Sequence, residues 1–218
     1  MSKRNREISI AAMFAALAVV LAFFCKTMGI PLVAVSFLHF DCKDFIIAIS
    51  GFVLNPLYAV GISFVVALIE VLTFSDTQIW GMVMNFISSA VFAGVASIIY
   101  YRWRNIRGAV LGLLCSTVMT TIVMLGWNYL IVPLYTPMYT RDAVAKMLLP
   151  TFLPYNLIKY SINAGITLFV YKPLTTALQQ IGFLERKNGE KLRINPLTYA
   201  VGAAFILLSV GAILIIRL

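Results

Sequence analysis

One apolar segment late in the sequence carries four polar side chains that could bind a small molecule. They share the spacing i, i+3, i+4 and i+7, which places them on one face of a helix: Asn156, Lys159, Tyr160 and Asn163. Lys159 follows Pro150 by nine residues, about 14 Å along a helix, and so stands near the middle of a membrane. A charge there costs roughly 2.5–3.5 kcal/mol on insertion scales, which indicates a functional site inside a helix bundle. The alternative is a lysine that a carbonyl or carboxylate holds only for packing.

Two other apolar segments each bring an asparagine to a similar depth. Asn128 lies five residues before Pro133, and Asn85 lies five residues after Trp80. Aromatic and soft side chains flank these positions: Phe40, Met84, Trp127, Tyr129, Tyr135 and Tyr155. Such a lining suits a flat, partly apolar ligand whose hydrogen-bonding edge meets the amides. Asparagines can also serve only to join helices.

The sequence lacks the residue patterns that catalysis would need. His39 is its only histidine and stands in a segment expected outside the membrane, so an intramembrane Ser-His pair or H-E-x-x-H zinc site cannot form. No G-x-x-x-x-G-K-[ST] motif for ATP occurs. We therefore expect a binding protein that is not an enzyme and has no cofactor or metal ion. Energy to concentrate its ligand would come from other subunits.

The cysteines give no sign of a metal cluster or a disulfide framework. Cys25, Cys42 and Cys115 show no C-x-x-C spacing and are odd in number. We expect free thiols, with a bridge between Cys25 and Cys42 as the alternative.

The composition shows which kind of protein must position these residues. The chain is 61% hydrophobic and 11% charged, whereas soluble domains have roughly 45–50% apolar and about 25% charged residues. Since about 20 apolar residues cross a bilayer core, we expect an all-α integral membrane protein with helices near 8–24, 44–54, 57–73, 80–100, 109–132, 150–171 and 197–216. The second of these helices is too short to span a membrane alone, because it rises only about 16 Å before Asn55-Pro56 breaks it.

The basic residues predict the orientation in a cell membrane. With the N-terminus in the cytoplasm, eleven of the 17 lysines and arginines lie inside and five outside, with Lys159 within a helix. This orientation puts segments 25–43, 74–79 and 133–149 outside and makes the predicted pocket open outward. Four acids are then expected outside: Asp41, Asp44, Asp76 and Asp142. Glu70, near an outer helix end, could face either the pocket or the surface. The net charge of +9 reflects this topology and not a nucleic-acid partner.

The first helix carries small residues that would let another helix approach closely. Two overlapping Ala-x-x-x-Ala pairs lie on it: Ala11, Ala12, Ala15 and Ala16. They indicate either a partner subunit or packing within the bundle.

Several segments resemble one family of membrane proteins. They are the alanine pairs of the first helix, Leu38-His39-Phe40-Asp41-Cys42-Lys43-Asp44, Asn85-Phe86, M-L-G-W-N-Y-L-I-V-P-L-Y at 124–135 and L-P-Y-N-L-I-K-Y-S-I-N at 153–163. Residues 8–173 resemble the S component, the substrate-capturing membrane subunit of energy-coupling-factor (ECF) vitamin importers, and most closely its RibU-type riboflavin family. The chain departs from the usual K-F-D-x-S-D-I-P, which here reads H-F-D-C-K-D-F-I, and from a usual Gly-Pro, which is here Asn55-Pro56.

The resemblance implies a six-helix substrate-binding bundle, which we place within residues 1–176. The tail at 177–218 has no counterpart in the family, and its sequence predicts a polar tether and an additional C-terminal transmembrane helix. It implies that Asn128, Asn156 and Lys159 hold riboflavin and that the segment from Leu38 to Asp41 helps to cap it. The full set of expected ligand-binding residues is Leu38, Phe40, Asp41, Met84, Asn85, Asn128, Tyr129, Asn156, Lys159, Tyr160 and Asn163. The alanines would meet a transmembrane coupling subunit that works with two ATPase subunits. The alternatives are another vitamin, such as pantothenate or folate, or a non-transport membrane assembly protein.

Overall fold

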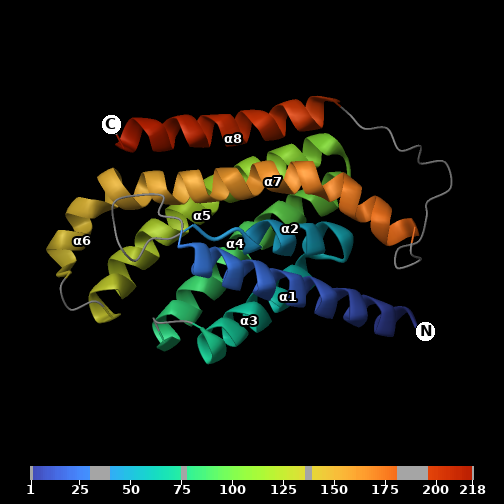
Figure 1. Cartoon of the computed structure of the whole chain (residues 1–218), viewed down its shortest axis with the longest axis horizontal. Helices are drawn as coiled ribbons and strands as arrows, with labels where there is room; N and C mark the ends of the chain where they lie inside the picture. Colours follow the sequence, from blue (N-terminus) through green and yellow to red (C-terminus); the bar gives the residue numbers. More distant parts are fainter. Residues whose placement is uncertain (1, 30–39, 75–77, 136–138, 181–195, 218) are drawn as a thin grey trace.

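The computed structural model describes residues 2–29, 40–74, 78–135, 139–180 and 196–217, and within these ranges it contains helices and no strand. The elements, shown in Figure 1, are α1 (Lys3–Met28), α2 (Lys43–Val53), α3 (Pro56–Thr73), α4 (Gln78–Trp103), α5 (Ile106–Tyr135), α6 (Arg141–Met147), the π-helical turn η1 (Leu148–Phe152), α7 (Leu153–Gln180) and α8 (Pro196–Arg217). All seven predicted helices are present, and the all-α membrane fold is confirmed.

Four of the described helices are long and apolar enough to cross a membrane. Their apolar stretches are Arg4–Met28, Pro56–Thr73, Ile79–Trp103 and Ile106–Leu134. At 28 residues, α7 is about 42 Å long and also exceeds the bilayer core of about 30 Å. Its polar stripe makes α7 less apolar than those four, as expected for a helix that faces protein on one side.

Several helices extend beyond their predicted boundaries: α1 covers Lys3–Met28 where the sequence predicted 8–24, and two helices continue past prolines. α5 continues past Pro133 and α7 past Pro173, although the sequence predicted ends at residues 132 and 171. In membrane helices neighbouring groups compensate for the lost backbone bond, so proline does not force an end. The segment 133–149 was expected only as an external connection, yet it contains α6. Thr140 begins that helix by accepting a hydrogen bond from the Ala143 N–H at 3.3 Å.

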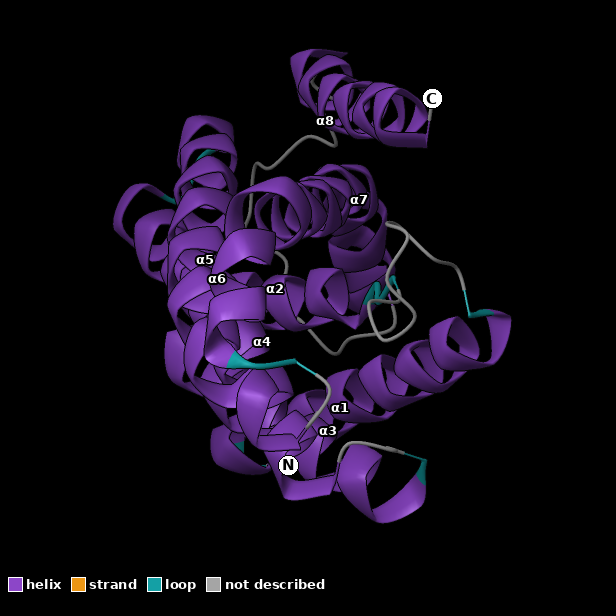
Figure 2. Cartoon of the chain, turned by 90° about the vertical axis from the view of Figure 1, so that its left-hand side faces the viewer, coloured by secondary structure: helices purple, strands orange, loops and turns teal. Residues whose placement is uncertain are grey.

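α2 lies at the centre of the bundle. All its residues from Lys43 to Phe52 are buried, and it packs against α1, α3, α4 and α7. Figure 2, which looks along the bundle, shows α2 enclosed by its neighbours. Gly51 permits this close packing, because a Cβ atom there would collide with Ser97 of α4 and Ala59 of α3. A helix too short to span the membrane is therefore a core element, and its first residues are inside the protein.

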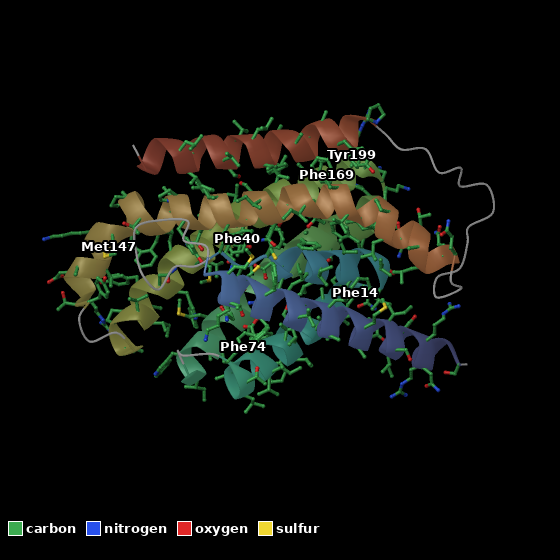
Figure 3. All side chains as sticks on the ribbon, viewed as in Figure 1. Phe14, Phe40, Phe74, Met147, Phe169 and Tyr199 are labelled. Carbon is green, nitrogen blue, oxygen red and sulfur yellow. The ribbon has the colours of Figure 1, made fainter. Side chains whose placement is uncertain are left out.

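α8 packs along α7, on the side away from α2 (Figures 1 and 2). The helices approach closely at Gly165 and Gly202, where a Cβ atom on Gly165 would lie 2.9 Å from the Gly202 carbonyl oxygen. Nearby, the rings of Phe169 and Tyr199 contact each other at a tilt of 48°, with centroids 5.3 Å apart (Figure 3). α1 begins at one end of the bundle, and α8 ends at the other (Figure 1).

Candidate ligand-binding site

The start of α2 brings charged side chains together inside the bundle. The Lys43 ammonium forms ion pairs with Asp41 and with Glu70 of α3, whose Oε1 lies 2.8 Å from Lys43 Nζ. Lys43 and Glu70 are only 2% and 3% exposed. On the other side of α2, Lys159 Nζ of α7 lies 3.5 Å from Oδ2 of the fully buried Asp44. We call these five residues the charge cluster: Asp41, Lys43, Asp44, Glu70 and Lys159.

Neutral side chains of α4 complete the charge cluster. Asn85 Nδ2 donates to Glu70 Oε2 at 2.7 Å, and Ser89 Oγ donates to Asp44 Oδ1 at 2.5 Å. Asp44 and Glu70 thus each have a lysine and a neutral donor, the combination that makes buried carboxylates tolerable. The expectation that Asp44 lies outside is corrected here. Because α2 is a core helix, its first turn is enclosed by protein.

Asp41 comes just before α2 and shows the combined effect of these lysines. Burial would raise the pKa of the Asp41 carboxyl, but the ammonium groups of Lys43 and Lys159 outweigh it and hold the pKa below its ordinary value. Asp41 therefore carries a negative charge at neutral pH.

Lys159 occupies the position that the sequence predicted, buried on α7 and 6% exposed. Its partner is the Asp44 carboxylate, as expected if the lysine serves only for packing. An ammonium group has three N–H donors, however, and the ion pair with Asp44 uses only one of them. Lys159 Nζ also lies 5.3 Å from the centroid of the Tyr160 ring, which stacks on Phe92 of α4. The geometry therefore supports a structural role and leaves donor capacity for a ligand.

Asn163 joins α7 to the start of α2. Its Oδ1 accepts a hydrogen bond from the Phe45 N–H at 3.0 Å, and its Nδ2 donates to the carbonyl oxygens of Asp41 at 3.0 Å and Lys159 at 2.9 Å. The Phe45 N–H belongs to the first turn of α2, where backbone donors have no partner within the helix. Since both N–H groups of Asn163 are used, this residue positions the charge cluster.

Asn128 of α5 and Asn156 of α7 are both buried. Each Nδ2 donates at 2.7 Å to the carbonyl oxygen four residues earlier, Met124 for Asn128 and Phe152 for Asn156. That bond uses one of the two N–H groups of each amide. Both asparagines can therefore take a further hydrogen bond.

An apolar cluster lies where α5, α6 and the first part of α7 meet. It is made by buried side chains of α5, α6, η1 and α7: Val132, Val144, Phe152, Tyr155 and Ile158. Phe40 and Met147, labelled in Figure 3, pack against it. Trp127 of α5 packs against the main core instead, and its buried Nε1 has no hydrogen-bond partner among the described residues. Apolar walls beside a few polar groups are the usual composition of a small-molecule site.

The other expected site residues lie in different surroundings. Met84 packs against the main core, and the side chain of Asn85 donates its hydrogen bond to Glu70. Tyr129 is 37% exposed, because one residue step turns it about 100° around the helix from Asn128. Leu38 lies outside the described residues. The sequence analysis missed Lys43 as a site residue; the D-C-K-D order ahead of an apolar helix was its signal.

The alanine pairs of α1 lie beside a groove. Ala11, Ala12 and Ala15 line it together with residues of α3 that include Tyr58 and Gly61, and its volume is about 590 Å³. Ala16 is exposed on the same helix and does not line the groove. The small side chains leave room for a segment of another molecule.

Comparison with known proteins agrees with this arrangement. A family model described as "ECF transporter, substrate-specific component" matches residues 6–171. Among curated proteins, the chain is similar to the riboflavin transporter RibU of Staphylococcus aureus, with 26% identity over 82% of this chain and 95% of that protein. It is also similar to the riboflavin transporter RibU of Streptococcus thermophilus, with 24% identity over 81% of this chain and 86% of that protein. A solved structure of the S component of a bacterial ECF transporter superposes with a TM-score of 0.69 at 25% identity, covering 81% of this chain and 99% of that one.

Proposed function

The chain belongs to the family of substrate-specific components of ECF transporters, and from that premise we propose that it binds riboflavin for uptake by partner subunits. The family is one of transport components and not of enzymes, and its description implies no cofactor. The observation that carries the proposal is the burial of Asn156 and Lys159 on α7 and of Asn128 on α5, two helices that also supply side chains to the apolar cluster. The two relatives named above are riboflavin transporters, which supports the choice of ligand.

Riboflavin has the chemistry that these groups would recognise. Its ring system is flat and largely apolar, with carbonyl and ring nitrogen atoms along one edge and hydroxyl groups on a flexible chain. The apolar cluster would contact the ring, while Asn128, Asn156 and Lys159 would meet the polar atoms. A ligand that covers these donors without matching them leaves them unpaired, so a matching ligand is favoured over a poorly matching one.

We further propose that the N-terminus lies in the cytoplasm, that the site opens outward through the cell membrane, and that residues 1–176 bind the ligand. In this orientation the groove of α1 and α3 would receive a transmembrane coupling subunit, which acts with two ATPase subunits. The small alanine side chains support this role, since they allow close helix contact. The segment 177–218 would be a tether and an additional membrane helix.

The absorbance spectrum of the purified protein tests the ligand. We expect a yellow protein whose extract has a flavin spectrum and whose ligand-free form binds added riboflavin at one saturable site. Titrations with pantothenate and folate serve as controls. A colourless protein that does not bind riboflavin would contradict the proposal. Binding of pantothenate or folate alone would show that the ligand is another vitamin. Binding of none would support an assembly protein.

Reconstituted vesicles test the role of partner subunits. The chain alone should bind riboflavin without concentrating it inside, because it lacks a motif for ATP hydrolysis. Sustained concentrative uptake by the chain alone would overturn this part of the proposal.

Substitutions in α1 test the groove. Ala12→Trp should abolish coupled uptake and leave riboflavin binding intact, because the bulky ring keeps a partner helix out of the groove. Val20→Trp is the matched control, since Val20 is 64% exposed on the same helix and does not line the groove. Loss of binding together with uptake would show that the alanines pack within the bundle.

A further inference from the structure

Two thiols meet where the end of α1 approaches the start of α2. Cys25 Sγ and Cys42 Sγ are 2.9 Å apart, and both cysteines are free. Cys25 is 5% exposed in the last turn of α1, and Cys42 is partly buried just before α2. The contact is therefore fixed by two helices that pack against each other.

Hydrogen bonds hold the backbone in place next to both cysteines. α1 ends at Gly29, whose φ of 56° is left-handed and whose N–H bonds to the carbonyl oxygens of Cys25 and Lys26. On the other side, Asp41 and Phe45 are bonded to Asn163. The two sulfur atoms would have to approach by only about 0.9 Å to reach a disulfide bond length of about 2.0 Å.

We propose that Cys25 and Cys42 are a modification site, at which exchange with an external disulfide forms a covalent bond between α1 and the start of α2. Cys42 is the more accessible, so its thiolate attacks the oxidant first, forming a mixed disulfide and releasing one thiol. Cys25 then attacks the Cys42 sulfur, forming the protein disulfide and releasing the second thiol. The protein loses two protons and two electrons, and one oxidant disulfide becomes two thiols.

The bond would join α1 to a stretch of chain whose next residues belong to the charge cluster. Asp41 and Lys43 flank Cys42 directly, so the bond would fix the position of both backbones relative to α1. In the orientation proposed above, this end of α1 faces the outside of the cell, where disulfides persist. The bond itself rests on the sulfur contact alone and does not depend on the ligand.

The test uses full-length protein with Cys115→Ser, which removes the exposed third thiol on α5. The protein is incubated with oxidised glutathione, treated with N-ethylmaleimide, digested without reductant and analysed by mass spectrometry. We expect a peptide pair joined through Cys25 and Cys42, lighter by two hydrogen atoms than the two reduced peptides together. Dithiothreitol should separate the pair and make both cysteines available to maleimide.

Two matched variants identify the order of steps. With Cys25→Ser as well, Cys42 should retain glutathione, since no second thiol is present to displace it. With Cys42→Ser, the buried Cys25 should take up glutathione at least 10-fold more slowly than Cys42 does in the first variant. A stable glutathione adduct on Cys42 while Cys25 is present, or maleimide on both cysteines after oxidation, would overturn the proposal. The assay measures the masses of cysteine peptides and not ligand binding, so this outcome is separate from any failure of the proposed function.

Discussion

α7 holds two of its neighbours, α2 and α8, in different ways. Toward α2 it presents Lys159 and Asn163, which form an ion pair with Asp44 and hydrogen bonds to the backbone. Toward α8 it presents Gly165 and Phe169, which allow close backbone approach and ring contact. The first interface depends on matched chemical groups, and the second depends on shape.

The difference determines how each face should respond to substitution. A polar group that loses its partner inside an apolar bundle keeps its full desolvation penalty. An apolar contact loses only packing, and an outer helix can shift to relieve a clash. We therefore expect large effects on the α2 side and small effects on the α8 side.

Asp44→Ala should have the largest effect, because it leaves the Lys159 ammonium buried without its carboxylate. Removing one partner of a buried ion pair lowers the free energy of unfolding by about 3–5 kcal/mol, which unfolding measurements in detergent would detect. Combining Asp44→Ala with Lys159→Met removes both charges and should recover most of the loss. Equal instability of the single and double variants would show that the two charges are not coupled.

Lys159→Met tests the ligand role of the same face. It keeps the side-chain stem and deletes a charged donor worth about 1.5–3 kcal/mol, so riboflavin should bind roughly 10- to 150-fold more weakly in calorimetric titration. Lys172→Met is the control, because Lys172 is exposed on α7 and its loss should leave affinity unchanged. Unchanged affinity in Lys159→Met, with a lowered melting temperature, would mean that the lysine only balances Asp44.

Two asparagines of α7 should separate ligand binding from positioning. Asn163→Ala leaves the Phe45 N–H unsatisfied and should lower the free energy of unfolding by about 1–3 kcal/mol. Asn156→Ala should instead weaken riboflavin binding by about 2- to 13-fold, as expected for a neutral hydrogen bond of about 0.5–1.5 kcal/mol, with little change in stability. Melting curves and riboflavin titrations of both variants measure these effects. Equal losses of stability and of affinity in the two variants would show that the two asparagines do not differ in role.

Gly202→Val should have the smallest effect on the site. Its side chain would crowd Phe169 and the Gly165 carbonyl and displace α8, lowering the free energy of unfolding by about 1 kcal/mol. Riboflavin affinity should remain within about twofold, since the crowding is near the start of α8, whereas the α8 residues that pack against the apolar cluster, Ala212 and Ile213, lie near its end. Gly211→Val is the control, because a Cβ atom there meets nothing within 4 Å. A large loss of affinity in Gly202→Val alone would show that α8 supports the site.

The polar stripe of α7 was predictable because its residues lie on one helix and follow its period. Burial of Asn156, Lys159, Tyr160 and Asn163 agrees with that prediction, whereas their contact with riboflavin stays a prediction. The partners of the stripe could not be predicted, because Asp44, which pairs with Lys159, and Phe45, which bonds to Asn163, belong to another helix. Asp44 follows a segment that the sequence places outside the membrane. Its burial becomes evident only when the structure shows that α2 lies at the centre of the bundle.

The same limit applies to individual side chains near the stripe. Tyr129 is next to Asn128 in sequence, and proximity along the chain suggested a shared site, but adjacent helical residues face different directions. Asn163 shares a face with Lys159, yet its amide is committed to the start of α2. A helical period places residues on a face and does not say which of them are already satisfied.

The position of α8 has a practical consequence for reporters fused to this protein. α1 begins and α8 ends at opposite ends of the bundle (Figure 1). If α1 begins in the cytoplasm, a peptide tag attached after α8 is displayed on the cell exterior, whereas truncation after α7 would return the tag to the interior. Antibody labelling of intact cells that carry each tagged form would therefore read out whether α8 crosses the membrane.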